Sequence, residues 1–135
     1  MIKKVLVLGG TGAMGVYLVP ALSKRGYHID VVSLDDVAST DPNVTYIQAN
    51  AMDDDVLRTL LRNGYDGIVD FMIYSNPQFR VRLPLFAAHT KHYIFLSTYR
   101  VYAGEIPITE RSPRLLDVAT DDAPYLARAE EEYSL

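Results

Sequence analysis

The chain opens with a short apolar run that ends in a cluster of glycines, VLVLGGTGAMG at residues 5–15. A helical pattern follows at once, so the order is strand, tight turn, helix. Such a turn leaves backbone N–H groups free at the amino end of a helix, where the helix dipole adds partial positive charge. Glycine has no Cβ and tolerates positive φ, so an anionic group can approach the backbone closely. The segment therefore predicts a cradle for the pyrophosphate of a dinucleotide.

Two registers of a glycine motif match this turn. Gly10, Gly12 and Gly15 spell G-x-G-x-x-G, while Gly9, Gly12 and Gly15 spell G-x-x-G-x-x-G. Such a motif is informative only between a strand and a helix of a βαβ unit, and that is its context here. The competing interpretation is an ordinary glycine-rich turn without a ligand, which this context makes the weaker one.

Length and composition bound the class of protein. The chain has 135 residues, enough for one domain spanning residues 1–135. With 49% hydrophobic and 22% charged residues, it can bury a sizeable core. The formal net charge of −4 argues against a broad surface that binds nucleic acid.

The cysteine and histidine content limits which metal sites and nucleophiles the chain can have. There is no cysteine, which excludes disulfides, thiolate metal ligands and a cysteine nucleophile and suits a reducing cytoplasm. His28, His89 and His92 lack metal-ligand spacing, and the acidic run at residues 53–55 fits a helix N-terminus better than a metal site. The first apolar run stops at Gly9, too short for an export or membrane segment. We expect a cytoplasmic protein without a metal.

Hydrophobic periodicity predicts alternating strands and helices. The predicted strands span residues 3–8, 29–34, 44–48, 67–71 and 92–98, and the predicted helices span 13–24, 53–62 and 77–89, with a last helix beginning near Tyr125. Pro20 and Pro84 fall inside predicted helices, where a proline costs roughly 3 kcal/mol. Strands that alternate with helices indicate an α/β, doubly wound parallel sheet. Right-handed crossovers then give the strand order 3-2-1-4-5.

Four segments carry motifs that occur together in one family. They are GGTGAMG at residues 9–15, residues 43–53, YDGIVDF at 65–71 and YIFLSTYRVY at 93–102. Together they resemble the extended short-chain dehydrogenase/reductase family, the NAD-dependent epimerases and dehydratases. Members of that family are much longer and join a Rossmann domain to a C-terminal substrate domain. The resemblance implies that residues 1–135 are an incomplete NAD(P)-binding Rossmann domain, truncated before the substrate domain.

The resemblance also assigns roles in the glycine turn. Gly9 would make the tight turn, Gly12 would admit the pyrophosphate, and Gly15 would let helix and sheet close up. Three residues would offer backbone N–H groups to the phosphates: Thr11, Ala13 and Met14.

A carboxylate after the second strand decides between NAD and NADP, because it binds the ribose hydroxyls and repels a 2′-phosphate. Asp35 lies 20 residues past Gly15, close to the expected spacing, but Ser33 occupies the family's usual acidic position. Asp35 and Asp36 are also compatible with a plain solvated turn. No arginine follows the strand, so the sequence favours NAD and leaves NADP open.

Further along, the resemblance places Asn50 and Ala51 near the adenine. Asn50 stands where the family commonly has aspartate, and its amide can both donate and accept a hydrogen bond. Phe71 begins a bulky stretch where the family often has small residues beside the cofactor. Either this stretch narrows the cofactor groove or it belongs to the core, and we favour the core.

For catalysis, the resemblance places the family's hydroxyl at Thr98, where open α/β sheets hold their ligands. The family's acid/base tyrosine is followed four residues later by a lysine, which favours the ionised phenol. Tyr125 follows Pro124 but has Ala129 at that position, and the fourth neighbour of Tyr133 lies beyond the sequence. We favour Tyr133, with Tyr125 as the alternative. Lacking this pair, the chain as given is expected to have no normal catalysis.

These observations predict the dinucleotide-binding part of an NAD(P)-dependent epimerase, dehydratase or reductase acting on a nucleotide sugar or similar small molecule. The alternative is a non-catalytic dinucleotide-binding sensor or regulatory module. A fifth strand at the sheet edge and the last two helices lead us to expect a homo-oligomer. The sequence does not name the substrate.

Overall fold

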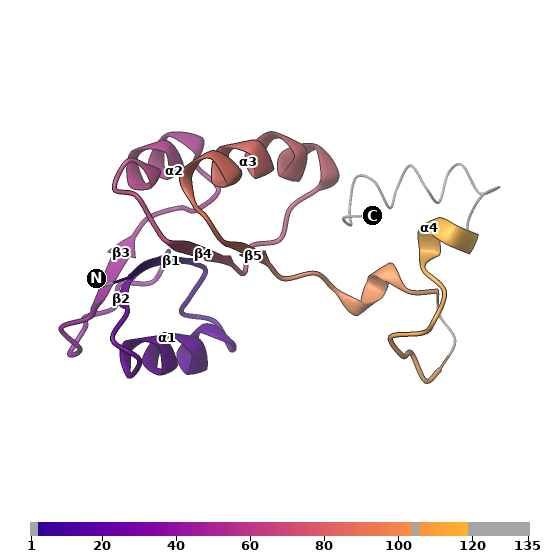
Figure 1. Cartoon of the computed structure of the whole chain (residues 1–135), viewed down its shortest axis with the longest axis horizontal. Coiled ribbons are helices and arrows are strands. Elements are labelled where there is room, and N and C mark those ends of the chain that lie inside the picture. The colour runs from indigo at the N-terminus through magenta and orange to yellow at the C-terminus, as the bar shows by residue number, and fades with distance from the viewer. Residues whose placement is uncertain (1–2, 104–105, 119–135) are drawn as a thin grey trace. The chain divides into compact units, whose positions relative to one another are not determined.

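The computed structural model describes residues 3–103 and 106–118 (Figure 1). Within these ranges the chain forms two compact units, one of residues 3–72 and 84–96 and the other of residues 73–83, 97–103 and 106–118. The elements are β1 (Lys4–Leu8), α1 (Gly15–Ser23), β2 (His28–Ser33), β3 (Val44–Gln48), α2 (Asp54–Leu61), β4 (Gly67–Asp70), α3 (Asn76–His89), β5 (Tyr93–Phe95), the 3-10 turn η1 (Tyr99–Val101) and α4 (Leu115–Val118).

The first unit is built on one parallel sheet of five strands in the order β3-β2-β1-β4-β5, as the sequence predicts. At its centre Val7 pairs with Val31 of β2 on one side and with Val69 of β4 on the other. Most of β1 and β2 is buried on both faces, which explains why these strands read as almost continuous apolar runs. The fold is therefore a doubly wound Rossmann sheet.

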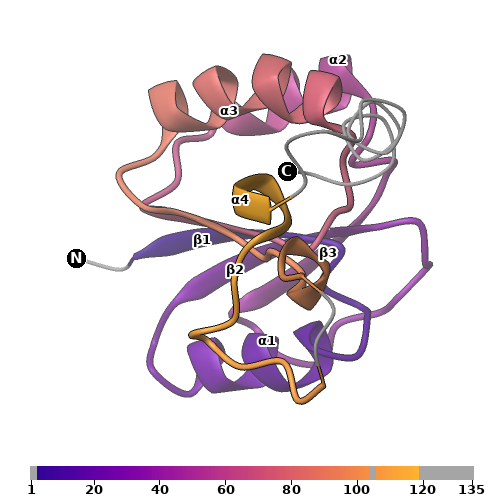
Figure 2. The same ribbon diagram turned by 90° about the vertical axis from the view of Figure 1, so that its right-hand side faces the viewer.

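Helices cover the two faces of this sheet unequally. Figure 2 shows α1 on one face and α2 on the other, and residues 84–89 of α3 share the face with α2. The core beneath α1 contains Val5, Val7, Val19, Ile29, Val31 and Val44. The larger core on the other face contains Leu6, Leu8, Val32, Ala51, Leu57, Leu60, Leu61, Tyr65, Ile68 and Phe86.

The acidic run before α2 is a helix cap. Asp53 lies at the N-cap, and its carboxylate accepts hydrogen bonds from the backbone N–H groups of Asp55 and Val56 at 2.9 and 3.3 Å. Asp54 and Asp55 occupy the first turn, where the helix dipole favours negative charge. This local chemistry accounts for the run, and in the described part of the chain no group of acidic or histidine side chains could hold a metal ion.

The largest departure from the predicted elements is the fifth strand, which we expected over residues 92–98 and which ends at Phe95. Its partner β4 ends at Asp70, so the last hydrogen bond of this pair runs from the Leu96 N–H to the Asp70 carbonyl at 3.3 Å. Without a partner beyond that point the chain leaves the sheet. The first helix also begins later than predicted, at Gly15, because residues 9–14 form the turn.

In the second unit, residues 98–103 and 106–118 are held by local contacts. Tyr102 forms an isolated antiparallel bridge with Arg114, and the Ala103 N–H donates to the Pro113 carbonyl at 2.8 Å. Arg114 also donates two hydrogen bonds of 2.8 Å to the Asp117 carboxylate, which lowers the pKa of that carboxyl. The predicted helix near Tyr125 lies outside the described residues. None of the helices that the structure describes is long and apolar enough to span a membrane.

Candidate functional site

The glycine turn joins β1 to α1 at the carboxyl edge of the sheet. Gly9 has a φ of +72°, a conformation that other residues rarely adopt. Its N–H donates to the Val32 carbonyl at 2.9 Å, and its carbonyl accepts the Gly12 N–H at 3.3 Å. The turn is therefore anchored to β2 at one end and closed on itself at the other.

Gly10 and Gly15 allow the turn to pack against the sheet. A Cβ at Gly10 would lie 2.7 Å from Cγ1 of Val31 and 2.8 Å from Cγ1 of Val7, closer than real Cβ contacts. A Cβ at Gly15 would overlap the Gly10 backbone. Both glycines are required by the close approach of α1 to the sheet.

Gly12 lies in a different environment. It is exposed, and a Cβ there would meet only the Gly9 carbonyl oxygen, at 3.6 Å. A side chain at this position would project into open space above the turn. Gly12 is therefore not needed for packing, and the space that its missing side chain leaves is accessible to a ligand.

Backbone donors surround this space. Within residues 3–103 and 106–118, the N–H groups of Thr11, Ala13, Met14 and Gly15 have no hydrogen-bond acceptor. Met14 occupies the N-cap of α1 and supplies no side-chain hydrogen bond to the helix. Uncapped N–H groups at a helix N-terminus, together with the helix dipole, form an anion-binding arrangement.

A pocket of about 350 Å³ opens beside the turn. Its walls come from four loops at the carboxyl edge: Gly9, Val32, Ser33, Leu34, Asp35, Ala49, Asn50, Ala51, Met52 and Met72. The first wall is the glycine turn, and the others follow β2, β3 and β4. Parallel strands bring these loops together, because all of their carboxyl ends lie at one edge of the sheet.

Thr11, Ser33 and Asp35 form a hydrogen-bonded cluster at this edge. Oγ1 of Thr11 donates to Oδ2 of Asp35 at 2.6 Å and lies 2.7 Å from Oγ of Ser33. Oγ of Ser33 also lies 3.2 Å from Oδ2 of Asp35 and accepts the Asp35 N–H at 3.1 Å. The carboxylate thus sits against the glycine turn, although Ser33 holds the position that is acidic in the family.

This cluster bears on the two interpretations of Asp35, which are a carboxylate that binds the cofactor ribose and part of a plain solvated turn. Its carboxylate lines the pocket and is held by two hydroxyl groups, whereas Asp36 is exposed and is not among the lining residues. The sequence analysis considered Thr11 only for its backbone N–H. Its side-chain role could have been anticipated from the topology, because β1 and β2 are neighbours and hydroxyl residues follow or end both.

Asn50 and Ala51, which the resemblance placed near the adenine, are found in the loop after β3. Both line the pocket, with Asn50 exposed and Ala51 buried in the core beneath it. Oδ1 of Asn50 accepts the Met52 N–H at 2.9 Å, so the orientation of the amide is defined. Around it the pocket presents the apolar side chains of Leu34 and Met52.

Phe71 belongs to the core and is absent from the pocket wall. It packs against the cluster beneath α1, and its N–H donates to the Leu8 carbonyl at 3.1 Å. Successive side chains point to opposite faces of a sheet, so it is Met72 that lines the pocket. The sulfur of Met72 would be 3.3 Å from a Cβ at Gly9, which leaves glycine as the residue that fits there.

Asp70 supports this wall and was not predicted from the sequence. It is fully buried, and its carboxylate accepts the Met72 N–H at 2.9 Å and the Tyr93 hydroxyl at 2.8 Å. Tyr93 in turn stacks on Phe86, with ring centroids 4.9 Å apart. These contacts fix the turn after β4, and with it the position of Met72 beside the glycines.

The predicted catalytic residues are not gathered at this pocket by any described contact. Thr98 lies three residues past the end of β5, in the second unit, and its carbonyl accepts the Val101 N–H at 3.3 Å. Tyr125 and Tyr133 lie outside the described residues. Their roles stay predictions.

A uniformly parallel sheet with a glycine turn, bare helix amides and a pocket at its carboxyl edge defines a nucleotide-binding α/β protein. The profile of the NAD dependent epimerase/dehydratase family matches residues 5–90. The chain therefore belongs to the NAD dependent epimerase/dehydratase family, which confirms the resemblance seen in the sequence. The NAD in the family's name agrees with the cofactor that the sequence favours.

Solved structures of similar fold come from bacteria and an archaeon. The enzyme WbmG of Bordetella bronchiseptica, in complex with NAD and UDP, is 18% identical with a TM-score of 0.68, over 84% of this chain and 44% of that one. Uronate dehydrogenase of Agrobacterium tumefaciens is 17% identical with a TM-score of 0.60, over 77% and 44%. The epimerase Mth375 of Methanothermobacter thermautotrophicus is 18% identical with a TM-score of 0.62, over 82% and 40%.

The match spans less than half the length of each of these structures. At these identities they establish the fold alone. Among curated protein sequences, no significant match is found.

Proposed function

We propose that this chain binds NAD at the carboxyl edge of its sheet, as the cofactor-binding part of an epimerase, dehydratase or reductase. The observation that carries the proposal is the set of bare N–H groups around Gly12, at the N-terminus of α1. A pyrophosphate carries the charge that such a site attracts and the acceptors that its donors lack. The neighbouring pocket has room for the adenosine half of the cofactor.

The residues around the pocket fit the pyrophosphate and the adenosine ribose of NAD. The N–H groups of Thr11, Ala13 and Met14 would hold the pyrophosphate, and Asp35 would accept hydrogen bonds from the ribose hydroxyls. Only Oδ2 of Asp35 is engaged by described residues, so Oδ1 remains available to a ribose hydroxyl. A carboxylate there repels a 2′-phosphate, which supports NAD over NADP.

The base would lie between apolar side chains and an amide. Leu34 is 70% exposed although it is a large hydrophobic residue, and it lines the pocket together with Ala51 and Met52. Such a surface gains from contact with the face of a purine. Asn50 would face the polar edge of the base, where its Nδ2 donates and its Oδ1 accepts.

The reaction chemistry that we propose follows the family. When bound, the nicotinamide supplies hydride transfer at a carbonyl or alcohol carbon of a nucleotide sugar or similar small molecule. Thr98 would hydrogen-bond the substrate oxygen, and Tyr133, or alternatively Tyr125, would carry the acid/base proton. Ala129 stands four residues after Tyr125, and the fourth position after Tyr133 lies beyond residue 135. The absence of cysteine fits a cytoplasmic setting.

The proposal also includes self-association. In α3 the apolar side chains of Val81 and Leu83 are 65% and 39% exposed, and they lie on different sides of the helix. Exposed apolar side chains are more stable when covered, and a second copy of the chain could cover either of them. Sedimentation velocity over a range of concentrations tests this: a monomer at every concentration would rule it out.

Calorimetric titration of the full chain with NAD and with NADP tests the cofactor proposal. The decisive variant is Gly12→Val, because an added Cβ meets only the Gly9 carbonyl oxygen, at 3.6 Å, and the side chain would project into the proposed phosphate space. We expect NAD to bind the unaltered chain and not this variant. The matched control is Gly67→Val, at the opposite end of the strands, where a Cβ also has room. Equal NAD binding by Gly12→Val and the unaltered chain would refute the proposed site.

The sensor alternative shares this cofactor site and differs only in catalysis. No observation in the described residues favours it. The gene sequence beyond residue 135 distinguishes the two: a lysine four residues after Tyr133 with a substrate domain supports the enzyme, and a stop codon supports a binding module.

A further inference from the structure

Thr11, Ser33 and Asp35 form a closed ring of hydrogen bonds beside the proposed NAD pocket. Each hydroxyl has a single proton to donate, so the direction of every bond in the ring can be worked out. The contact between the Thr11 hydroxyl and Oδ2 of Asp35 is the shortest of them, at 2.6 Å, and its acceptor is charged. Thr11 therefore donates its proton to Asp35.

The remaining bonds of the ring follow from that assignment. Because Oγ1 of Thr11 has committed its own proton, it can only accept the proton of the Ser33 hydroxyl, 2.7 Å away. The other contact of that hydroxyl, with Oδ2 of Asp35, is longer, at 3.2 Å. Oγ of Ser33 in turn accepts the backbone N–H of Asp35 at 3.1 Å. Hydrogen bonds linked in this way polarise one another, so each is stronger than it would be alone.

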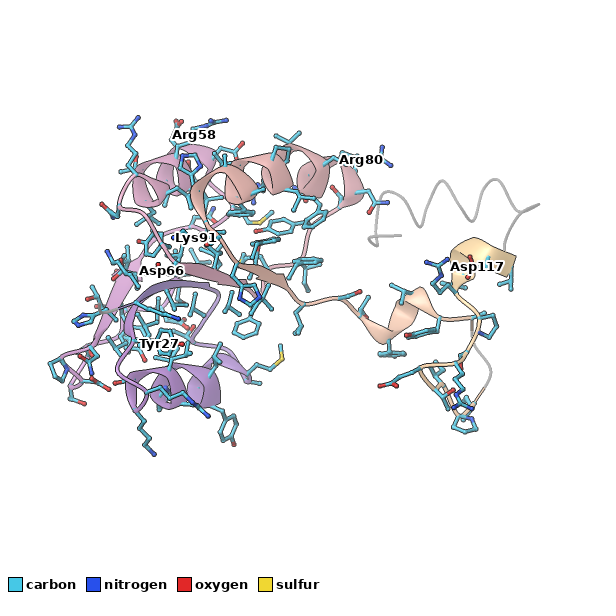
Figure 3. The ribbon with its side chains drawn as sticks, viewed as in Figure 1. Tyr27, Arg58, Asp66, Arg80, Lys91 and Asp117 are labelled. Atoms are coloured by element: carbon cyan, nitrogen blue, oxygen red, sulfur yellow. The ribbon has the colours of Figure 1, made fainter. Side chains whose placement is uncertain are left out.

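The ring lies at the carboxyl ends of the strands. In Figure 3, the labelled Asp66 and Lys91 mark the opposite ends, because they come just before β4 and β5. Every bond of the ring is made between residues 11 and 35, so no residue outside this stretch is needed to form it.

Thr11 joins two parts of the proposed cofactor site. It belongs to the glycine turn, and its backbone N–H has no acceptor within residues 3–103 and 106–118. Asp35 follows β2, 24 positions further along the chain, and lines the pocket. Thr11 thus offers its N–H to the proposed phosphate space, while its hydroxyl holds the carboxylate next to the proposed ribose position.

We propose that Thr11 is a positioning residue that sets the preference for NAD over NADP by holding Asp35 in one rotamer. This inference rests on the proposed NAD site and adds to it the residue that fixes its selectivity. A carboxylate held at Oδ2 keeps Oδ1 in one place, where it accepts a bond from a ribose hydroxyl and repels a 2′-phosphate. Asp35 is exposed, so without the Thr11 hydroxyl its side chain would spread over about three staggered rotamers.

Thr11→Val tests the proposal, because valine keeps the β-branched shape and the backbone N–H and removes only the hydroxyl. If the released carboxylate occupies the productive rotamer about a third of the time, NAD should bind about threefold more weakly. NADP should bind more tightly by about the same factor, because it selects the other rotamers. Calorimetric titration of the full chain with both cofactors should therefore find the ratio of their affinities shifted about tenfold.

Three other variants separate the hydroxyl from the rest of the side chain. Thr11→Ser keeps the hydroxyl and should restore the affinity ratio of the unaltered chain. Ser33→Ala should shift the ratio less than Thr11→Val, because Thr11 still has its proton for Asp35. The matched control is Thr45→Val, the same substitution at an exposed position of β3 that does not line the pocket, and it should leave the ratio unchanged.

A double-substitution cycle shows whether Thr11 acts through Asp35. Adding Thr11→Val to Asp35→Asn should shift the ratio no further, because the charge that Thr11 holds is already gone. Shifts that simply add would overturn the proposal. An unchanged ratio in Thr11→Val would also overturn it, as would a failure of Thr11→Ser to restore the ratio or a shift in Ser33→Ala as large as that in Thr11→Val.

Urea unfolding of the same variants tests the ring without any cofactor, after circular dichroism has established that each is folded. The losses in unfolding midpoint caused by Thr11→Val and Asp35→Asn should not add, because both substitutions break the same hydrogen bond. Additive losses would overturn the ring itself. If the losses are coupled but the unaltered chain binds neither cofactor, the proposed NAD site fails and takes the selectivity role with it. If NAD binds and the ratio does not move, the site stands and only the role of Thr11 fails.

Discussion

Replacing Asp35 with asparagine should shift the cofactor preference from NAD towards NADP. The substitution keeps the shape of the side chain and removes its charge. In the structure, Oδ2 of Asp35 is held by Thr11 at 2.6 Å, and Oδ1 has no partner among the described residues. The free oxygen is the one that would accept a hydrogen bond from the ribose 2′-hydroxyl. A 2′-phosphate would take the place of that hydroxyl and lie beside the carboxylate.

The size of the effect follows from the charges. Two unit charges about 5 Å apart in a water-like medium interact by roughly 0.8 kcal/mol. A phosphate monoester carries a charge of about −1.5 to −2, so Asp35 should repel it by roughly 1.5 kcal/mol, or about tenfold in affinity. NAD should lose about fivefold in Asp35→Asn, because a neutral amide accepts a weaker hydrogen bond than a carboxylate. The ratio of the two affinities should therefore move by about fiftyfold.

Calorimetric titration of both cofactors at low and high salt measures this ratio. The matched control is Asp36→Asn, since Asp36 is the adjacent exposed carboxylate and does not line the pocket. It should leave the ratio unchanged. The shift in Asp35→Asn should shrink at high salt, where charge repulsion is screened. If Asp35→Asn leaves the ratio within twofold of the unaltered chain, the carboxylate does not face the ribose and the reasoning fails.

Three further substitutions test contacts in the first unit. Gly10→Ala should destabilise the fold by about 1–3 kcal/mol in urea unfolding because its Cβ is overpacked, and an unchanged midpoint would contradict this. Burial and the hydrogen bond to Asp30 raise the pKa of Tyr65 above its usual 10.0, so the unfolded chain ionises first and stability falls above that pH. Tyr65→Phe should lose this alkaline decline, and an unaltered pH profile would refute the assignment. The Ser23 hydroxyl lowers the pKa of Asp41 in the folded chain. The stability that ionised Asp41 contributes is therefore lost as pH falls through this lowered pKa. In Ser23→Ala, NMR titration should find the Asp41 pKa closer to 3.8, and no movement would rule out this cause.

The sheet could be predicted from the sequence because its signals are local. Each strand is a short apolar run, each helix has its own period, and parallel topology follows from their alternation. Val44–Gln48 matches the predicted third strand at both ends. The fifth strand ends earlier than predicted, because its neighbour β4 stops at Asp70. Residues 96–98 keep a strand-like sequence, so the sequence alone does not show that they lack a partner strand.

The pocket was predicted only in part, because some of its contacts also depend on which strands are neighbours. Glycine spacing indicates a phosphate turn, because the constraint acts within a few residues. The contacts of Thr11 with Ser33 and Asp35, and of Asp70 with Tyr93, join residues between 22 and 24 positions apart in the sequence. Such contacts depend on which strands are neighbours and on how far each extends. They become visible only when the register of the sheet is known.

The two ends of the sheet present different polar groups. At the carboxyl edge, the amino end of α1 supplies bare N–H groups, and one carboxylate, Asp35, limits which anions fit. At the amino edge the strands begin among lysines, and the carboxylates there are engaged: Asp30 by Lys4 at 3.0 Å and Asp66 by a backbone N–H. An anion held at the carboxyl edge would meet oriented backbone dipoles, so its affinity should depend on the geometry of the glycine turn. The Lys4–Asp30 ion pair at the other end is partly exposed, so its strength should fall as salt rises.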